Sequence, residues 1–396
     1  MAGWRIAGRG GARTGARRGR GAALVGASAG AGGGARDGTG LGAFGRSWDL
    51  VHLGNLCVDI TLNVPSLPPQ GRKREAAQRA LADVGEGAEV EIGGSGNVLV
   101  MGSRLGMRCA GIGHFGDDDN AGVFMRRELA KEGVELQRLE AGTSDSAGRT
   151  LECFVLLDPE KRHAFSSRYD QGPIPIFGQD FAFDKATLKN ITTAGGLSLN
   201  GMTFDELPTP VIFDAAAAAR ANRAEVMFDP GPRAPAFGGE RRAELDLTLC
   251  SATVLSLTED ELEFISPGVA PEDAAHRLLN RFGGRTGGCL DWVVVKQGPK
   301  GAFACGNFGS TFHEAYQVDL VDSVGCGDSF DAALLLGRMR GLSVQSSLRL
   351  ACAAGAATAE GRGAGRNVGT LSRMSELVEE KYGTDERTAL FNSILA

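Results

Sequence analysis

The sequence predicts an α/β fold with a mainly parallel sheet and helices on both of its faces. Short apolar segments alternate with longer segments of helical period along most of the chain, and Gly-rich turns separate them. Repeated strand–helix units favour parallel strands, because each helix carries the chain back to the starting edge of the sheet. A chain of 396 residues supplies enough apolar material for one large domain.

Composition excludes several classes of protein. Hydrophobic residues make up 42% of the chain and charged residues 23%, which is ordinary for a soluble globular protein. No segment approaches 18 uninterrupted apolar residues, so we expect no membrane span. The eight cysteines contain no C-x-x-C pair, and the five histidines are scattered. This spacing argues against a disulfide scaffold, a zinc site or a histidine metal site.

Residues 1–47 differ from the rest of the chain. They carry eight arginines against the single acid Asp37, a net charge of +7, which leaves −13 for the remainder of a chain whose net charge is −6. An Arg-rich, acid-poor segment of this kind is typical of an organellar transit peptide, for a chloroplast or a mitochondrion. A disordered linker and a basic RNA-binding arm are the alternatives; without a transit peptide we expect a cytoplasmic protein. The acidic body predicts no nucleic-acid partner.

The first half of the chain predicts three helices and six strands. Prolines 65, 68 and 69 predict a loop over residues 65–90. Strands of a hairpin flank an Asp-Pro turn and interrupt the alternation, which makes the hairpin a lid, a homodimer contact or a surface ribbon. The expected strands are 49–53, 109–113, 150–157, 163–167, 197–199 and 225–228, and the expected helices are 98–105, 120–132 and 211–222.

The second half continues the alternation. Thr258 and Glu261 match a capping box, so a helix should start there, and Ser343 can cap another. Glycine after residue 340 ends the helix before it. The expected strands are 253–257, 291–295, 302–305, 311–316 and 316–321. One expected helix begins at 258, and the other expected helices cover 274–282, 329–340, 346–360 and 372–382.

The segment 322–328, Asp-Ser-Val-Gly-Cys-Gly-Asp, joins an expected strand to an expected helix. A glycine-bearing turn that opens a helix is an anion site, because unpaired N–H groups and the helix dipole both favour negative charge. Asp328 lies at the mouth of this turn. A carboxylate beside bound phosphates suggests a base that accepts a proton from an attacking hydroxyl. An Asp that only caps the helix is the alternative.

Two further features fit a ligand site at the same edge of the sheet. Asp59 follows the first strand, where open α/β sheets bind ligands, although a turn aspartate is equally consistent with this position. A Gly-rich segment at 93–96 precedes Asn97 and a helix, and this pattern alone is equally typical of a tight turn. No G-x-G-x-x-G follows the first strand, which argues against a dinucleotide-binding oxidoreductase.

These motifs resemble the PfkB (ribokinase-like) family of carbohydrate and nucleoside kinases. Residues 93–97 through 104–106 and residues 322–328 carry the resemblance, and the second stretch is the more specific. The resemblance implies a ribokinase-like three-layer α/β/α sandwich with a small β lid at about 150–167. It implies a kinase domain over residues 48–375 and leaves 376–396 as a C-terminal tail.

The resemblance also implies roles for individual residues. Asp328 would be the general base beside an anion hole, and Asp59 would bind the sugar. ATP and Mg²⁺ are the implied cofactors, with K⁺ as a monovalent cation. The implied positions are Gly325, Cys326 and Gly327 in the anion hole; Gly94 and Asn97 with Asp59 at the sugar; Lys296, Gly298, Gly301 and Glu259 at the nucleotide; and Asp322, Val324 and Gly363 at the cation.

The chain departs from the family pattern at three places. Two residues instead of three separate the glycine pair from Asn97, and Ser256 stands where the family's N-x-x-E motif has Asn. Cys326 replaces a common alanine; a thiol at a helix N-terminus can have a lowered pKa, which suggests redox sensitivity. We therefore expect an ATP-dependent kinase for an alcohol group of a sugar or nucleoside, with a catalytically inactive organellar scaffold as the alternative.

Overall fold

The computed structural model describes residues 47–84, 89–140, 149–160, 162–167 and 176–395. The expected transit segment therefore lies outside the described residues, except for Ser47. None of the helices in the described part is long and apolar enough to cross a membrane.

A nine-stranded sheet forms the centre of the described residues, in the order β13-β12-β11-β10-β9-β8-β1-β4-β5. The strands from β11 to β5 run parallel, and β12 and β13 join the edge antiparallel. The sheet consists of β1 (Leu50–Leu53), β4 (Cys109–Gly113), β5 (Glu135–Arg138), β8 (Gly196–Asn200), β9 (Glu225–Asp229), β10 (Val254–Thr258), β11 (Trp292–Lys296), β12 (Gly301–Gly306) and β13 (Gly309–Glu314).

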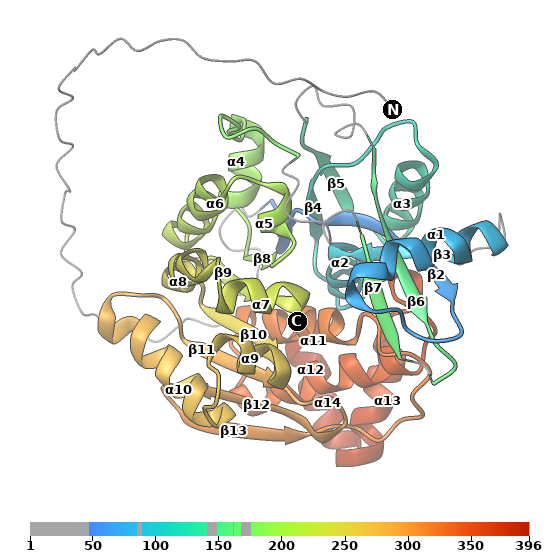
Figure 1. The fold of residues 1–396 in the computed structure, drawn as a ribbon. Helices are drawn as coiled ribbons and strands as arrows, with labels where there is room; N and C mark the ends of the chain where they lie inside the picture. The colour runs from blue at the N-terminus through green and yellow to red at the C-terminus, as the bar shows by residue number, and fades with distance from the viewer. Residues whose placement is uncertain (1–46, 85–88, 141–148, 161, 168–175, 396) are drawn as a thin grey trace, which may run out of the picture. The chain divides into compact units, whose positions relative to one another are not determined.

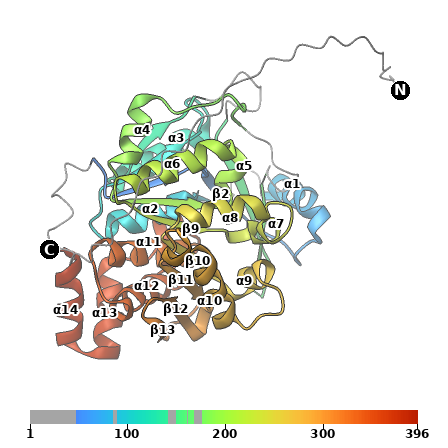
Figure 2. The ribbon, with the colours of Figure 1, turned by 90° about the vertical axis from the view of Figure 1, so that its left-hand side faces the viewer.

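Helices cover both faces of this sheet, as the alternation predicts. Val294 packs into the core cluster on one face, while Val293 and Val295 pack into the cluster on the other, because side chains alternate along a strand. Figure 2 shows α6 and α8 on the opposite side of β9 and β10 from α11 and α12. One layer holds α2 (Ser95–Arg104), α3 (Asn120–Lys131), α11 (Cys326–Met339), α12 (Val344–Ala359), α13 (Leu371–Tyr382) and α14 (Thr384–Leu395). The other holds α4 (Lys185–Thr192), α5 (Thr203–Glu206), α6 (Thr209–Ala221), α7 (Ala234–Gly238), α8 (Arg242–Ser251), α9 (Glu259–Ile265) and α10 (Pro271–Phe282).

A second sheet of four strands forms the lid, in the order β3-β2-β6-β7. It consists of β2 (Leu56–Asn63), β3 (Glu89–Gly94), β6 (Leu151–Leu157) and β7 (His163–Ser166), and α1 (Lys73–Val84) packs on it. The hairpin expected at 150–167 corresponds to β6 and β7. Figure 1 shows this sheet and α1 together beside α2.

Three predictions about local structure are wrong. Residues 65–90 contain α1 rather than loop alone, because the prolines end at Pro69 and a helix-favouring run follows. Residues 316–321 form no strand. The glycines at 93 and 94 end a strand rather than form a loop, because β3 pairs with β2 through Gly94.

The described part of the expected C-terminal tail, residues 376–395, is helical. These residues complete α13 and form α14. Leu390, Phe391 and Ile394 of α14 are buried in the same core as α11 and α12. The folded core therefore extends to the last described residues.

We expect Phe391→Ala to lower the free energy of unfolding by about 3 kcal/mol, because it removes a buried aromatic side chain and leaves a cavity. Chemical denaturation measures this change. Leu395→Ala is the matched control: its side chain is 57% exposed, and we expect a change below about 0.5 kcal/mol. Equal effects of the two substitutions would show that α14 is not part of the core.

Candidate active site

The N-terminus of α11 lies at the centre of the candidate site. Gly325 caps this helix with φ +79°, in the left-handed region that favours glycine, and no side chain caps the helix. A Cβ at Gly325 would lie 2.9 Å from Cβ of Ala364. The first N–H groups of a helix lack partners within it. The backbone N–H of Cys326 donates to the carbonyl oxygen of Ser323 at 3.3 Å, and no side chain occupies the end of the helix. An anion could therefore approach the N-terminus of α11.

Asp328 lies in the first turn of α11 and is partly exposed. Nδ2 of Asn97 donates a hydrogen bond of 2.8 Å to Oδ2 of Asp328. Burial raises the pKa of Asp328 to about 6, and the hydrogen bond from Asn97 opposes this rise. The carboxyl group is therefore mostly ionised at pH 7 and able to accept a proton.

Asn97 is held from both ends of its amide group. While Nδ2 donates to Asp328, Oδ1 accepts a hydrogen bond of 2.8 Å from the backbone N–H of Gly365. Asn97 lies in the first turn of α2 and is 2% exposed. Because each end has its own partner, only one orientation of the amide satisfies both bonds.

Asp59 lies on β2 of the lid sheet, and its carboxyl group packs directly over Gly93. A Cβ at Gly93 would lie 2.1 Å from Oδ1 of Asp59, so only glycine leaves room for this carboxyl group. Burial, followed by repulsion from Asp328 and Glu91, raises the pKa of Asp59 to about 7. Gly94 of β3 (φ +52°) lies beside Cys57, which is on β2 together with Asp59. The expected sugar-binding residues and the expected base are thus brought together.

Lys296 lies at the end of β11, beside the same turn. A Cβ at Gly327 would lie 3.5 Å from Nζ of Lys296. Nζ donates to Asp229 at 2.8 Å and to Asp331 at 3.2 Å. Burial would lower the pKa of Lys296, but these two carboxylates hold it above its usual value. The ammonium group is therefore charged and fixed next to the proposed anion hole.

Ser256 contacts the charged group formed by Lys296, Asp229 and Asp331 and does not reach the surface. It is fully buried and donates a hydrogen bond of 2.5 Å to Asp331. Asp229 and Asp331 were not singled out as site residues by the sequence analysis. Two signals could have found them: Asp229 ends a parallel strand, and Asp331 follows Asp328 by three residues on one face of a helix.

The turn after β11 carries the remaining residues expected at the nucleotide. Gly298 has φ +55°, and Gly301 has φ +120° with no room for a Cβ, which would lie 2.0 Å from the carbonyl oxygen of His313. Glu259 accepts a hydrogen bond of 2.9 Å from Gln297 and lies 3.5 Å from Lys300. Glu259 therefore contacts this turn and not the carboxylates around Lys296.

Glu261 lies closer to that charged group. Burial and then repulsion from Asp229 raise its pKa, while Lys296 opposes the rise. Glu261 also accepts a hydrogen bond of 2.7 Å from the backbone of Thr258, which completes the expected capping box. Sequence reasoning assigned Glu261 only to the helix cap and missed its place beside Asp229.

The two halves of the expected cation loop meet. Oδ1 of Asp322 accepts a hydrogen bond of 3.1 Å from the backbone of Val324, and Oδ2 accepts one of 2.9 Å from Gly363. These contacts join the segment before α11 to the loop after α12. Oxygen ligands of this kind suit a hard cation.

The expected low pKa of Cys326 is wrong. Burial raises the pKa of this thiol to about 12, and repulsion from Asp322 and Asp328 adds to the rise. The N-terminal position in α11 does not compensate for these effects. A thiol with a raised pKa holds little thiolate at neutral pH, so the structure gives no support for redox sensitivity at Cys326.

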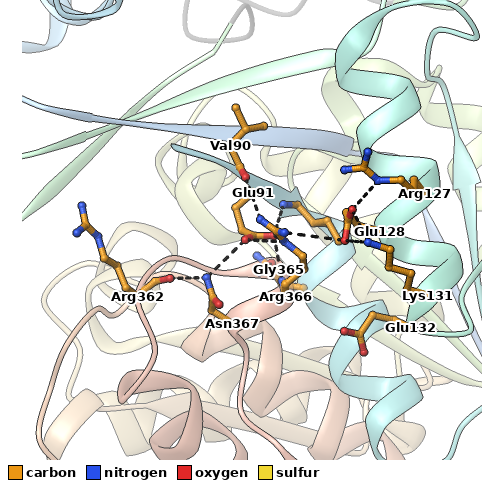
Figure 3. Close-up of polar contacts among 12 residues, drawn as sticks. Val90, Glu91, Arg127, Glu128, Lys131, Glu132, Arg362, Gly365, Arg366 and Asn367 are labelled. Carbon is orange, nitrogen blue, oxygen red and sulfur yellow. Dashed lines mark hydrogen bonds and ion pairs between the residues drawn. The ribbon is translucent and has the colours of Figure 1, made fainter. Parts of the chain in front are cut away.

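A buried carboxylate behind Asn97 supports the loop that holds it. Glu91 of β3 is 5% exposed, and it accepts hydrogen bonds from the backbone N–H of Arg366 at 3.1 Å and from its Nε at 3.0 Å. Figure 3 shows Arg366 between Glu91 and Glu128 of α3, next to Gly365. This contact ties the lid sheet to the loop whose Gly365 fixes Asn97.

The chain matches a family model. The model for pfkB family carbohydrate kinases matches residues 51–371. An ATP-dependent ribose-1-phosphate kinase from Halopiger xanaduensis is 29% identical over 338 residues, which covers 83% of this chain and 97% of the relative.

Solved structures show the same fold. A probable sugar kinase protein from Rhizobium etli superimposes with a TM-score of 0.69 at 17% identity, over 85% of this chain and 98% of that one. A putative ribokinase II from E. coli in complex with ATP and Mg²⁺ gives a TM-score of 0.64 at 20% identity, over 84% and 99%. These similarities confirm the expected ribokinase-like three-layer α/β/α architecture.

We expect Arg366→Ala to lower the free energy of unfolding by about 1–2 kcal/mol, because it leaves the buried carboxylate of Glu91 without charge-assisted partners. Arg362→Ala is the matched control on the same loop. Arg362 pairs at 3.3 Å with Glu89, and both side chains are about half exposed, so we expect a change below about 0.5 kcal/mol. Chemical denaturation of both variants measures the difference, and equal losses would contradict a supporting role for Arg366.

Proposed function

The chain belongs to the pfkB family of carbohydrate kinases, and on this basis we propose that it is an active kinase for an alcohol group. It transfers the γ-phosphoryl group of ATP to a hydroxymethyl group of a sugar or nucleoside. The observation that carries the proposal is the hydrogen bond from Asn97 to Asp328 at the uncapped N-terminus of α11. An Asp that served only as a helix cap would bond to the helix backbone, and no such bond caps α11.

In this proposal Asp328 is the general base. It accepts the proton of the acceptor hydroxyl as the oxygen attacks the phosphoryl group, so the oxygen gains nucleophilic character when it is in line. Its raised pKa brings it closer to the operating pH, which makes proton acceptance more favourable than for an ordinary carboxylate.

Backbone N–H groups of residues 325–327 form the proposed anion hole. They are fixed donors at the positive end of α11 and need no reorganisation as negative charge develops. Lys296, held by Asp229 and Asp331, adds a fixed positive charge beside Gly327. Such fixed electrostatics is the main help that phosphoryl transfer requires from a protein.

The residues present suit ATP. The turn at 298–301 has the glycine backbone that allows close approach of a nucleotide, and Gly327 has no side chain to block a phosphate. ATP supplies the phosphoryl group, and Mg²⁺ neutralises its charge. Asp322, Val324 and Gly363 would bind a monovalent cation such as K⁺, and Glu259 would contact the nucleotide through its turn.

Asp59 would accept a hydrogen bond from a second hydroxyl of the substrate and so aim the reacting hydroxyl at Asp328. The lid sheet that carries Asp59 would exclude water and suppress hydrolysis of ATP. We also propose that residues 1–47 direct the protein to a chloroplast or mitochondrion, and that any homodimer forms through the lid.

Asp328→Asn tests the role of the base. We expect kcat to fall by about 10²–10⁴-fold, because the amide cannot accept the proton. A screen of sugars and nucleosides with ATP, run on the wild-type chain and this variant, measures the effect. A full rate in the variant would refute the assignment of Asp328, and the absence of turnover with every substrate would favour the inactive scaffold.

The pH dependence of kcat/KM tests the ionisation of Asp328. We expect the rate to fall tenfold per pH unit below about pH 6, because the base must be deprotonated to act. Asn97→Ala removes the hydrogen bond that lowers the pKa of Asp328, so the acid limb of the profile should move to higher pH. An acid limb that stays in place in this variant would contradict the coupling between the two residues.

A further inference from the structure

Three potential metal ligands meet between α10 and the β12–β13 hairpin. Glu272 and His276 are four residues apart on α10, and side chains at this spacing share one face of a helix. Cys305 of β12 packs in the core cluster that contains α10, together with Phe303. Its nearest cross-strand neighbour is Ser310 of β13.

The donor atoms of these residues lie close together. One ligand atom each from Glu272, His276 and Cys305 lies within 4.8 Å of the others. Oγ of Ser310 lies 3.1 Å from Nε2 of His276 and 3.4 Å from Sγ of Cys305. Ligands at 2.0–2.3 Å from a tetrahedral zinc ion are separated by about 3.3–3.8 Å. The three ligand atoms, at up to 4.8 Å from one another, would have to move closer together by rotation of their side chains to reach this geometry.

We propose that Glu272, His276 and Cys305 bind a zinc ion, with Oγ of Ser310 or a water molecule as the fourth ligand. Imidazole nitrogen, thiolate sulfur and carboxylate oxygen are the donors that zinc uses in proteins. A thiolate and a carboxylate together balance the charge of Zn²⁺. Glu272 is exposed and His276 partly exposed, so an ion can reach the site from solvent.

Zinc binds cysteine as the thiolate, so Cys305 must lose its proton when the metal binds. Zinc affinity should therefore increase with pH.

This site is separate from the proposed catalytic residues and does not depend on them. It joins α10 to the antiparallel strands at the edge of the main sheet. Because zinc would bind the folded chain and its ligands come from both α10 and β12, it would stabilise this edge by mass action. The sequence analysis missed this site because it contains no C-x-x-C pair. Glu272 and His276 are 4 residues apart, and Cys305 follows His276 by 29 residues.

Cobalt binding tests the proposal on the full chain after removal of metals with a chelator. Co²⁺ replaces Zn²⁺ at such sites, and a thiolate ligand gives a sulfur-to-cobalt charge-transfer absorption band. We expect this band on addition of Co²⁺, its loss on addition of excess Zn²⁺, and a higher melting temperature with Zn²⁺ than without it.

Three variants assign the ligands. Cys305→Ser should abolish the band, whereas Cys250→Ser, which changes an exposed cysteine outside the cluster, should retain it. Glu272→Gln changes an exposed side chain, so we expect this variant to fold normally. It should weaken Zn²⁺ binding at least about tenfold, because the loss of a residue that only hydrogen-bonds to a metal ligand already weakens binding by about that factor.

Three outcomes would overturn the proposal. The first is no charge-transfer band in the wild-type protein, the second is a band that persists in Cys305→Ser, and the third is an unchanged Zn²⁺ affinity in Glu272→Gln. Circular dichroism of each variant separates loss of metal binding from loss of folding.

Discussion

The hydrogen bond between Asn97 and Asp328 is the contact on which the rest of the site depends. It joins the first turn of α2 to the first turn of α11, which are 231 residues apart in the sequence. The backbone N–H of Gly365 donates to the other end of the same amide group and so favours the orientation that points Nδ2 at Asp328. Gly365 is in turn held by the contact between Arg366 and Glu91. The lid sheet, the loop after α12 and the proposed base therefore form one continuous arrangement.

The site concentrates more carboxylates than its cations can neutralise. Burial raises the pKa values of Asp59 and Asp328, and repulsion adds to the rise, from Asp328 and Glu91 at Asp59 and from Asp229 at Asp328. Lys296 pairs with both Asp229 and Asp331, and burial raises the pKa of Asp331. Carboxylates placed in this way cost folding free energy, and such a cost is commonly tolerated where the groups have a chemical role. Metal ions and hydroxyl groups of a substrate are the natural partners for this excess.

Local sequence patterns predicted most of the fold. The strand–helix alternation predicted the parallel sheet, and Thr258 and Ser343 cap α9 and α12 as expected. The failures occurred where local signals mislead. Prolines suggested a loop that contains α1, and α14 has too weak an apolar face to be recognised before its partners are known. The redox prediction for Cys326 failed because a helix N-terminus was considered without burial.

Sequence patterns alone were enough to predict the turn at Gly325 and the helix that begins after it, with Asp328 in its first turn. This prediction rests on short-range rules, because a turn or a helix start requires particular residues within a few positions. Only the tertiary structure placed Lys296 between Asp229 and Asp331, Arg366 against Glu91, and Cys305 beside His276. Contacts between distant segments depend on how the elements pack in three dimensions, and neither composition nor spacing along the chain records that packing.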